Sequence, residues 1–204
     1  GDLASGLSKL LKKCETQQHP AWKEAVKAFM LEEQRIAEVN TKAAGETMTP
    51  KMIFDVINDQ KKKNTVIATD VGQHQMWTAQ HIRFEKARRF ASSGGLGTMG
   101  YGLGAAIGAH IGSKDRVLLI TGDGSFGMNL NELATAVTYN VPVTIVIMNN
   151  GVLGMVRQWQ TLFYGKRYSS TVLNRKTDFV KLAEAFGLPA QRVSTAAEFE
   201  SAFN

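Results

Sequence analysis

The segment VLLITGDGSFG, residues 117–127, decides the fold class of this chain of 204 residues. Its first half is a run of apolar, mostly branched residues that predicts a buried strand over 117–121. Its second half is a glycine-rich loop, and the apolar spacing of residues 130–137 predicts a helix beyond that loop. A strand, a loop and a helix in this order are typical of one unit of a parallel α/β sheet.

The same alternation extends to both sides of this segment. We expect further strands at 65–69, 143–148 and 191–193, and further helices at 50–57, 100–110 and 178–186. A loop is expected over 70–93, and Thr195 with Glu198 has the pattern of a capping box for a last helix. The predicted fold is an α/β domain with a parallel sheet flanked by helices on both faces. Because the chain ends at Asn204, inside the last expected helix, we expect a C-terminal truncation that removes at least one strand.

The first 46 residues have a different pattern. Leucines at positions 3, 7, 10 and 11 share one face of an expected helix over 1–13, and a second helix is expected from Pro20 to Val39. A polar linker is expected over 40–46. We interpret residues 1–46 as a helical tail and linker from an upstream middle domain, and residues 47–204 as the main domain.

The composition is that of an ordinary globular protein, with 44% hydrophobic and 21% charged residues. No apolar run reaches about 18 residues, the length that a membrane span needs. The formal charge of +6 is dispersed along the chain, which favours a solvated surface over a nucleic-acid interface. Cys14 is the only cysteine, so an internal disulfide is excluded and a reducing, cytoplasmic location is expected.

The glycine loop at residues 122–127 matches the dinucleotide fingerprint Gly-x-Gly-x-x-Gly, but two features favour another ligand. No acidic residue occurs between Glu132 and Asp178, the interval in which a ribose-binding acid would stand. In addition, Asp123 inside the loop would repel a pyrophosphate unless a cation lay between them.

A magnesium ion would resolve this conflict, because Mg²⁺ takes about six oxygen ligands and commonly bridges a carboxylate to phosphate oxygens. Asp123 follows one expected strand, and Asn149 and Asn150 follow the next. The side chains are therefore expected to converge at the carboxyl edge of the sheet. The alternative interpretation is that Asp123 is a cap residue and that residues 149–151 form a plain turn.

Two segments together resemble the thiamine-diphosphate motif: residues 122–124, and Asn149-Asn150, which begins 26 positions after Asp123. Three other segments, at 71–77, 93–101 and 158–160, resemble the large, catalytic subunit of acetolactate (acetohydroxyacid) synthase. The resemblance covers roughly residues 49–199 and identifies the C-terminal thiamine-diphosphate-binding domain of that family. The family's usual proline is replaced here by Gly104, which we expect to loosen the start of the following helix.

The resemblance implies roles for individual residues. Mg²⁺ would be bound by Asp123, Asn150 and the carbonyl of Val152. The residues expected to contact thiamine diphosphate are Gln73, His74, Gly97, Met99, Gly124, Ser125, Met128 and Met155. Trp159 would stand at the substrate channel. Each also has a plainer interpretation: methionines are commonly core fillers, His74 can be an ordinary loop residue, and Trp159 can be a packing or interface residue.

The implied reaction is the decarboxylation of pyruvate and its ligation to a second 2-keto acid, pyruvate or 2-ketobutyrate, in branched-chain amino acid biosynthesis. The activating Glu of the family belongs to another domain, so no catalytic residue is expected in this chain. We expect the isolated chain to bind the cofactor weakly and to be inactive. The intact enzyme would also bind FAD and form a homo-oligomer, a dimer or tetramer, with a possible regulatory subunit.

Two alternatives stay open at this point. The first is another thiamine-diphosphate enzyme, such as a pyruvate oxidase, a keto-acid decarboxylase or a glyoxylate carboligase; residues 72–77 and Trp159 favour acetolactate synthase. The second is a dinucleotide-binding or purely structural module, against which the missing ribose acid and the Asp123–Asn150 pair both count.

Overall fold

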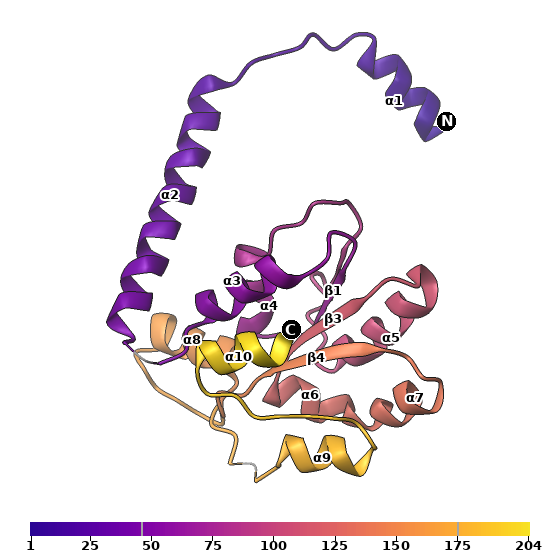
Figure 1. Cartoon of the computed structure of the whole chain (residues 1–204). Helices are drawn as coiled ribbons and strands as arrows, with labels where there is room; N and C mark the ends of the chain where they lie inside the picture. Colours follow the sequence, from indigo (N-terminus) through magenta and orange to yellow (C-terminus); the bar gives the residue numbers. More distant parts are fainter. Residues whose placement is uncertain (46, 175) are drawn as a thin grey trace. The chain divides into compact units, whose positions relative to one another are not determined.

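The computed structural model describes residues 1–45, 47–174 and 176–204. It divides into two compact units, Gly1–Gly45 and Glu46–Asn204, so the predicted boundary residue 46 lies outside the described residues. The first unit contains α1 (Leu3–Leu11) and α2 (Pro20–Ala43), which Figure 1 labels. Neither helix has a buried residue. The linker predicted over 40–46 is wrong for residues 40–43, because these residues continue α2. The helix ends only just before Gly45, which has the left-handed φ of +59° that is common after the last turn of a helix.

The second unit is built on a parallel sheet in the order β2-β1-β3-β4, which confirms the predicted α/β fold class. The strands are β1 (Val66–Thr69), β2 (Phe90–Ala91), β3 (Val117–Gly122) and β4 (Val143–Met148). Gly122 at the end of β3 is paired in register with Met148 at the end of β4. The loops that follow these two strands therefore leave the sheet side by side.

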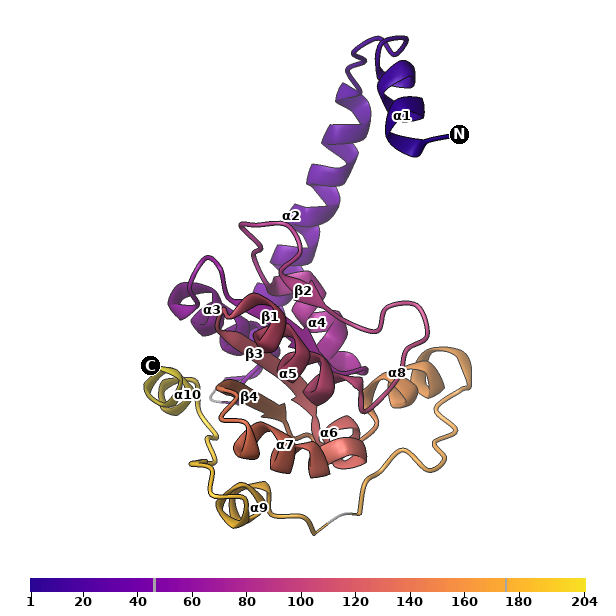
Figure 2. The same cartoon turned by 90° about the vertical axis from the view of Figure 1, so that its right-hand side faces the viewer.

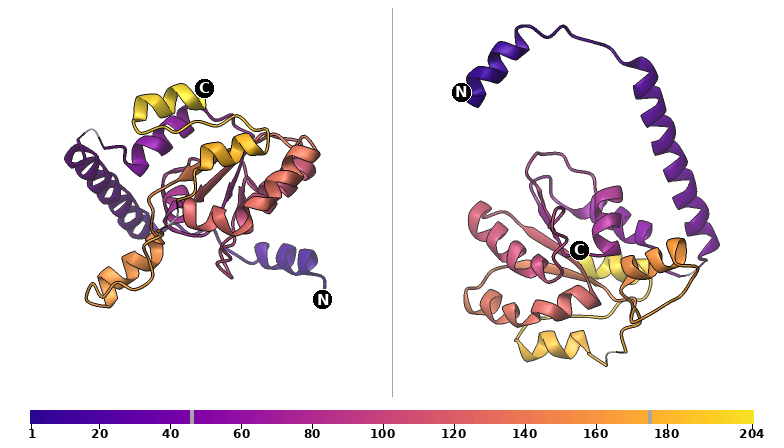
Figure 3. Two further views of the ribbon diagram at one scale, coloured as in Figure 1. Left: turned by 90° about the horizontal axis from the view of Figure 1, so that it is seen from below. Right: turned by 180° about the vertical axis from the view of Figure 1, so that it is seen from behind.

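Alternating side chains of the strands supply two apolar cores, one on each face of the sheet. On one face, Val117 and Leu119 pack with α5 (Tyr101–Ser113), α6 (Asp123–Asn129), α7 (Leu133–Thr138) and α9 (Phe179–Ala185). On the other face, Leu118 and Ile120 pack with α3 (Pro50–Gln60), α4 (Gln73–His81) and α10 (Ala196–Phe203). Figure 2 shows α5 and α7 on one side of the strands, and Figure 3 shows α10 beside α3.

Several predicted elements differ from the structure. Residues 73–81 form α4 and residues 90–91 form β2 within the segment expected to be a loop, and α8 (Gly154–Phe163) was not predicted. The glycine loop expected over 122–127 is wrong from Asp123 on, because these residues form α6. The helix expected over 130–137 is divided into the 3-10 turn Leu130–Glu132 and α7. The strand expected at 191–193 is absent from the described residues, where Val193 packs as a single side chain against the core that contains Phe199. The capping box of Thr195 and Glu198 is confirmed at the start of α10.

None of the helices formed by the described residues combines the length and the apolar character that crossing a membrane requires.

Candidate metal and phosphate site

The loops after β3 and β4 meet at the carboxylate of Asp123. Asp123 is the first residue of α6, directly after β3, and its side chain is buried. Burial raises the pKa of this carboxyl group, while main-chain N–H groups that donate to it, among them those of Asn150 and Gly151, lower the pKa and partly offset burial. A buried acid therefore faces the turn that follows β4, as the predicted metal site requires.

The turn after β4 is stabilised by the side chain of Asn150 and by the neighbouring segment at residues 171–172. The side-chain oxygen of Asn150 accepts the N–H of Val152 at 3.1 Å, and Gly151 takes φ +69°. Val152 forms an antiparallel bridge with Val172, and Leu153 N–H donates to the carbonyl of Thr171 at 2.8 Å. The amide oxygen of Asn150 has a second lone pair, which is available to a cation.

A cation bound at Asp123 would take most of its ligands from groups other than carboxylates. Among the residues that the structure describes, no three His, Cys, Asp or Glu side chains gather closely enough to share an ion. Amide, carbonyl, phosphate and water oxygens are the ligands that Mg²⁺ accepts beside a single carboxylate. The donor set at this edge of the sheet fits that pattern.

His74 supplies a buried polar atom that has no partner. The residue lies in the first turn of α4 with 6% of its surface exposed, and within the described part of the chain no atom hydrogen-bonds to its Nε2. Burial lowers the pKa of His74 to about 4, an effect that the main-chain carbonyl of Asp70 opposes. A Cβ at Gly72 would lie 2.8 Å from the ring Cε1, and one at Gly122 would lie 2.9 Å from Nδ1, so both glycines make room for the imidazole.

Gly124 and Met99 are brought together at the start of α6. A Cβ at Gly124 would lie 2.8 Å from Leu153 Cδ2, 3.2 Å from Leu173 Cδ1 and 3.8 Å from Met99 Cε. Only a glycine fits at this position without displacing its neighbours, which brings the main chain of α6 close to the side chain of Met99.

The other predicted cofactor contacts on this side of the sheet vary in their surroundings. Ser125 is buried, and its hydroxyl donates to the carbonyl of Val71 at 2.7 Å. Met128 is 54% exposed, and its Cβ would lie 3.3 Å from a Cβ at Gly100. Gly97 is exposed at φ +63°, and its N–H donates to the carbonyl of Ser93 at 3.1 Å.

Asp70 is a structural residue of this edge that the sequence analysis missed. Its buried carboxylate accepts the N–H of Gly100 at 2.7 Å, the N–H of Val71 at 3.1 Å and the hydroxyl of Thr121 at 3.3 Å. Burial raises the pKa of Asp70, and these hydrogen bonds oppose the change. Its signal in the sequence is its position directly after a buried strand, which it shares with Asp123.

Gln73, the first residue of α4, contacts α8 at Gly154 and at Gln158. Its Nε2 donates to Oε1 of Gln158 at 3.1 Å, and a Cβ at Gly154 would overlap the Oε1 of Gln73. The N-terminal turn of α4, which also carries His74, is thereby joined to the helix that follows the Asn150 turn.

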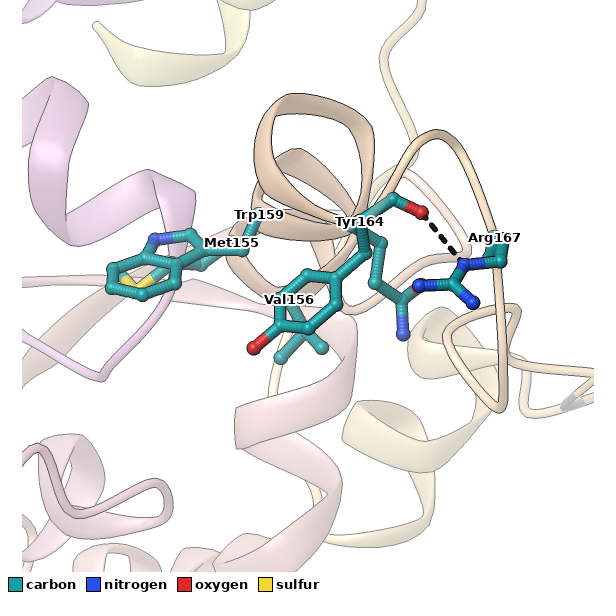
Figure 4. A pocket seen from close by; sticks show the side chains of 6 residues that line it. Met155, Val156, Trp159, Tyr164 and Arg167 are labelled. Atoms are coloured by element: carbon teal, nitrogen blue, oxygen red, sulfur yellow. Dashed lines mark hydrogen bonds between the residues drawn. The ribbon is translucent and has the colours of Figure 1, made fainter.

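Met155 and Trp159 line a separate hollow, formed by α8 and the segment after it. The hollow has a volume of about 620 Å³, and Figure 4 shows its side chains, including Tyr164 and Arg167. Trp159 is 58% exposed and makes an edge-on contact with Phe163, with ring centroids 5.4 Å apart. The structure thus gathers Asp123, the Asn150 turn, His74, Gly124 and Met99 at the edge of the sheet, and it places Met155 and Trp159 on α8.

In open parallel α/β sheets, ligands bind outside the carboxyl ends of the strands, which is where this chain has its buried acid and its asparagine turn. Residues 70–204 match the family described as "Thiamine pyrophosphate enzyme, C-terminal TPP binding domain", and the chain belongs to this family. The solved structure of the thiamine diphosphate-dependent 4-hydroxybenzoylformate decarboxylase of Rhodococcus jostii RHA1 superposes with a TM-score of 0.71 at 26% identity. That superposition covers 78% of this chain and 30% of the decarboxylase chain.

Within this family the chain is similar to acetolactate synthase large subunits. It is 51% identical over 154 residues to a probable acetolactate synthase large subunit of Methanococcus aeolicus, covering 74% of this chain and 26% of the relative. It is 45% identical to the isozyme 2 large subunit of Escherichia coli K12 (78% of this chain, 29% of the relative). With the large subunit of Corynebacterium glutamicum it shares 41% identity over 97% of this chain and 33% of the relative. The chain therefore spans about a quarter to a third of the length of these relatives.

Proposed function

We propose that this chain binds thiamine diphosphate through a Mg²⁺ ion at the carboxyl edge of the sheet. The ion would be held by the carboxylate of Asp123, the side-chain oxygen of Asn150 and the carbonyl of Val152. The observation that carries the proposal is the buried carboxylate of Asp123 against the main chain of Asn150 and Gly151. Burying a charged carboxylate is costly, and a bound divalent cation would compensate that cost.

The residues around this point suit a diphosphate. The unpartnered Nε2 of His74 is a buried ring nitrogen that needs a hydrogen-bond partner. The first N–H groups of a helix lack helical acceptors, so the start of α6 offers main-chain donors; that of Gly124 donates here to the carboxylate of Asp123, beside the proposed metal. We assign the diphosphate to Gln73, His74, Gly124 and Ser125, and the aminopyrimidine to the main chain of Gly97 and Met99. Met128 and Met155 would complete the apolar lining.

When bound, thiamine diphosphate supplies a nucleophilic carbon and an electron sink for the decarboxylation of a 2-keto acid. This chain's residues would hold the diphosphate and the metal, orient the rings against Met99 and exclude water from the reacting carbon. Trp159 on α8 would border the path of the second substrate. The proposed overall reaction is that of an acetolactate synthase, with pyruvate as donor and pyruvate or 2-ketobutyrate as acceptor.

The whole protein would need more than this chain. We propose that the carboxylate that activates the cofactor lies in another domain of a homo-oligomer and that FAD binds outside these residues. A regulatory subunit would associate with the intact enzyme.

Calorimetry tests the binding proposal directly. Thiamine diphosphate should bind to the purified chain when Mg²⁺ is present, and the affinity should fall when EDTA removes the metal. NAD, as a competing diphosphate ligand, should not bind under either condition. Binding of NAD would contradict the proposed site, and so would an affinity for thiamine diphosphate that is the same with and without Mg²⁺.

A second candidate is another reaction of the same cofactor. The structural similarity to a decarboxylase, at a TM-score of 0.71, favours considering it. Product analysis of the full-length enzyme on pyruvate separates the two: acetolactate supports ligation, and acetaldehyde alone supports simple decarboxylation.

A further inference from the structure

The side chain of Gln73 is held by two contacts with α8, one to Gln158 and one to Gly154, and we call this pair of contacts the clamp. Gln73 Nε2 donates to Oε1 of Gln158 at 3.1 Å, across 85 positions of sequence. It also lies against Gly154, one turn earlier on the same helix, where an added Cβ would overlap its Oε1 and lie 3.2 Å from its Cγ. The missing side chain at Gly154 is therefore a condition for the observed position of Gln73.

The clamp lies beside the proposed metal turn. Gln73 and Gln158 border a hollow of about 320 Å³ that also reaches Val152, the residue whose carbonyl we assign to the metal. Gly154 begins α8 only two positions after Val152. The contact between Gln73 and Gln158 therefore joins the proposed diphosphate contact to the helix that continues from the metal turn.

A glutamine side chain has several rotatable bonds, and fixing it on ligand binding costs conformational entropy. Its amide nitrogen carries two hydrogens. When Oε1 of Gln158 accepts one of them, the direction of the second hydrogen is fixed, and that hydrogen is available to a phosphate oxygen. Fixing the amide before binding reduces the cost of binding.

We propose that Gln158 is a positioning residue, which holds the side chain of Gln73 against Gly154 and so orients it for the diphosphate of the cofactor. This inference rests on the proposed function. Gln158 acts through Gln73 and does not itself contact the cofactor.

The test measures the affinity of the full chain for thiamine diphosphate by calorimetry at saturating Mg²⁺. Gln158→Met keeps the length of the side chain and removes the acceptor, and we expect it to weaken binding about fivefold, the effect of one net hydrogen bond. Gly154→Ala places a methyl group where the Gln73 amide lies and displaces it, and we expect a loss of at least the same size. It reports on the same contact should Gln158→Met fail to fold.

The matched control is Gln160→Met, because Gln160 lies on the same helix and its amide bonds to the main chain of Ser169. We expect this variant to bind like the unchanged chain. An equal loss in Gln160→Met and Gln158→Met would show a general effect of loosening α8 and would overturn the inference.

A double-mutant cycle separates positioning from general stability. In a Gln73→Met background, Gln158→Met should cause no further loss of affinity, since its effect passes through Gln73. Two outcomes would overturn the inference while leaving the proposed function intact, provided that the unchanged chain binds the cofactor. One is an additive loss of affinity in the double variant, and the other is an unchanged affinity in Gln158→Met. If the unchanged chain binds none, the proposed function fails, and the inference fails with it.

Discussion

At the scale of single residues, the buried carboxylate of Asp123 lowers the stability of the metal-free fold and, as we propose, binds the metal. Burial raises its pKa, so the charged form is unfavourable in the metal-free chain. We expect Asp123→Asn to weaken Mg²⁺-dependent binding of thiamine diphosphate by about tenfold or more, since a neutral amide is a poorer Mg²⁺ ligand than a carboxylate. The same variant should melt at the same or a higher temperature without metal. Calorimetry and thermal melts measure the two effects.

Asp178→Asn is the control for this substitution. Asp178 caps α9 by accepting the N–H groups of Val180 and Lys181. Its replacement should lower stability slightly and leave cofactor affinity unchanged. If Asp123→Asn bound thiamine diphosphate and Mg²⁺ like the unchanged chain, the metal site would be placed wrongly.

His74 should make the stability of the second unit depend on pH in a defined window. Its pKa is about 4 in the fold, against 6.5 for an unperturbed histidine, so the unfolded chain binds the proton more readily. The stability should therefore be constant above about pH 6.5 and fall by roughly 3 kcal/mol as the pH drops to 4, at about 1.4 kcal/mol for each pKa unit. Urea unfolding at several pH values measures this slope.

The contribution of His74 must be separated from those of the buried acids. Asp70 and Asp123 have raised pKa values, so their stability terms change in the opposite direction and increase as the pH falls. His74→Gln removes only the histidine term, and the difference between the two pH curves isolates it. His19→Gln, on an exposed residue at the start of α2, should leave the curve unchanged. Parallel curves for His74→Gln and the unchanged chain would contradict the assignment.

At the scale of one helix, two glycines of α5 should respond in opposite ways to the same substitution. Gly104 has open space where a Cβ would stand, whereas a Cβ at Gly102 would lie 2.8 Å from Leu119 Cδ1 and 2.9 Å from the main-chain nitrogen of Asp70. We expect Gly104→Ala to raise the free energy of unfolding by about 0.5–1 kcal/mol. Gly102→Ala should lower it by about 1–3 kcal/mol through overpacking. Equal effects of the two variants in urea unfolding would contradict the close approach of α5 to β1 and β3.

The elements that could be predicted from sequence are those with a strong apolar pattern. β3 and β4 are continuous apolar runs, and the capping box of α10 is a local signal, so all three were found. α4 was missed because only His74 and Thr78 among its residues are buried, both polar. α8 was missed although its apolar residues 155, 156, 159, 162 and 163 have helical spacing, because only the segment 158–160 was considered there, as part of the family resemblance. The predicted strand at 191–193 has no pairing partner among the described residues, and a short apolar alternation alone could not reveal that.

The same distinction applies to the site. Asp123 and Asn150 could be placed together because parallel strands release their loops at one edge. The clamp of Gln73 by Gly154 and Gln158 could not be predicted, since it depends on how α4 packs against α8, 85 positions away in the sequence. The pKa shift of His74 likewise depends on how closely Gly72 and Gly122 approach its ring.

At the scale of the whole molecule, the two units should differ in resistance to protease. The first unit contains helices without a buried residue, whereas the second unit contains both apolar cores. Helices without a packed core open easily, so we expect trypsin to cleave within residues 1–45 first and to leave a fragment that contains the sheet. Thiamine diphosphate with Mg²⁺ should then slow only the later cleavage of that fragment, because the proposed ligands all lie in the second unit. At a concentration one hundred times the Kd, the cofactor would stabilise this unit by about 2.7 kcal/mol. Protection of residues 1–45 by the cofactor, or equal cleavage of the fragment with and without it, would show that the second unit does not hold the binding site by itself.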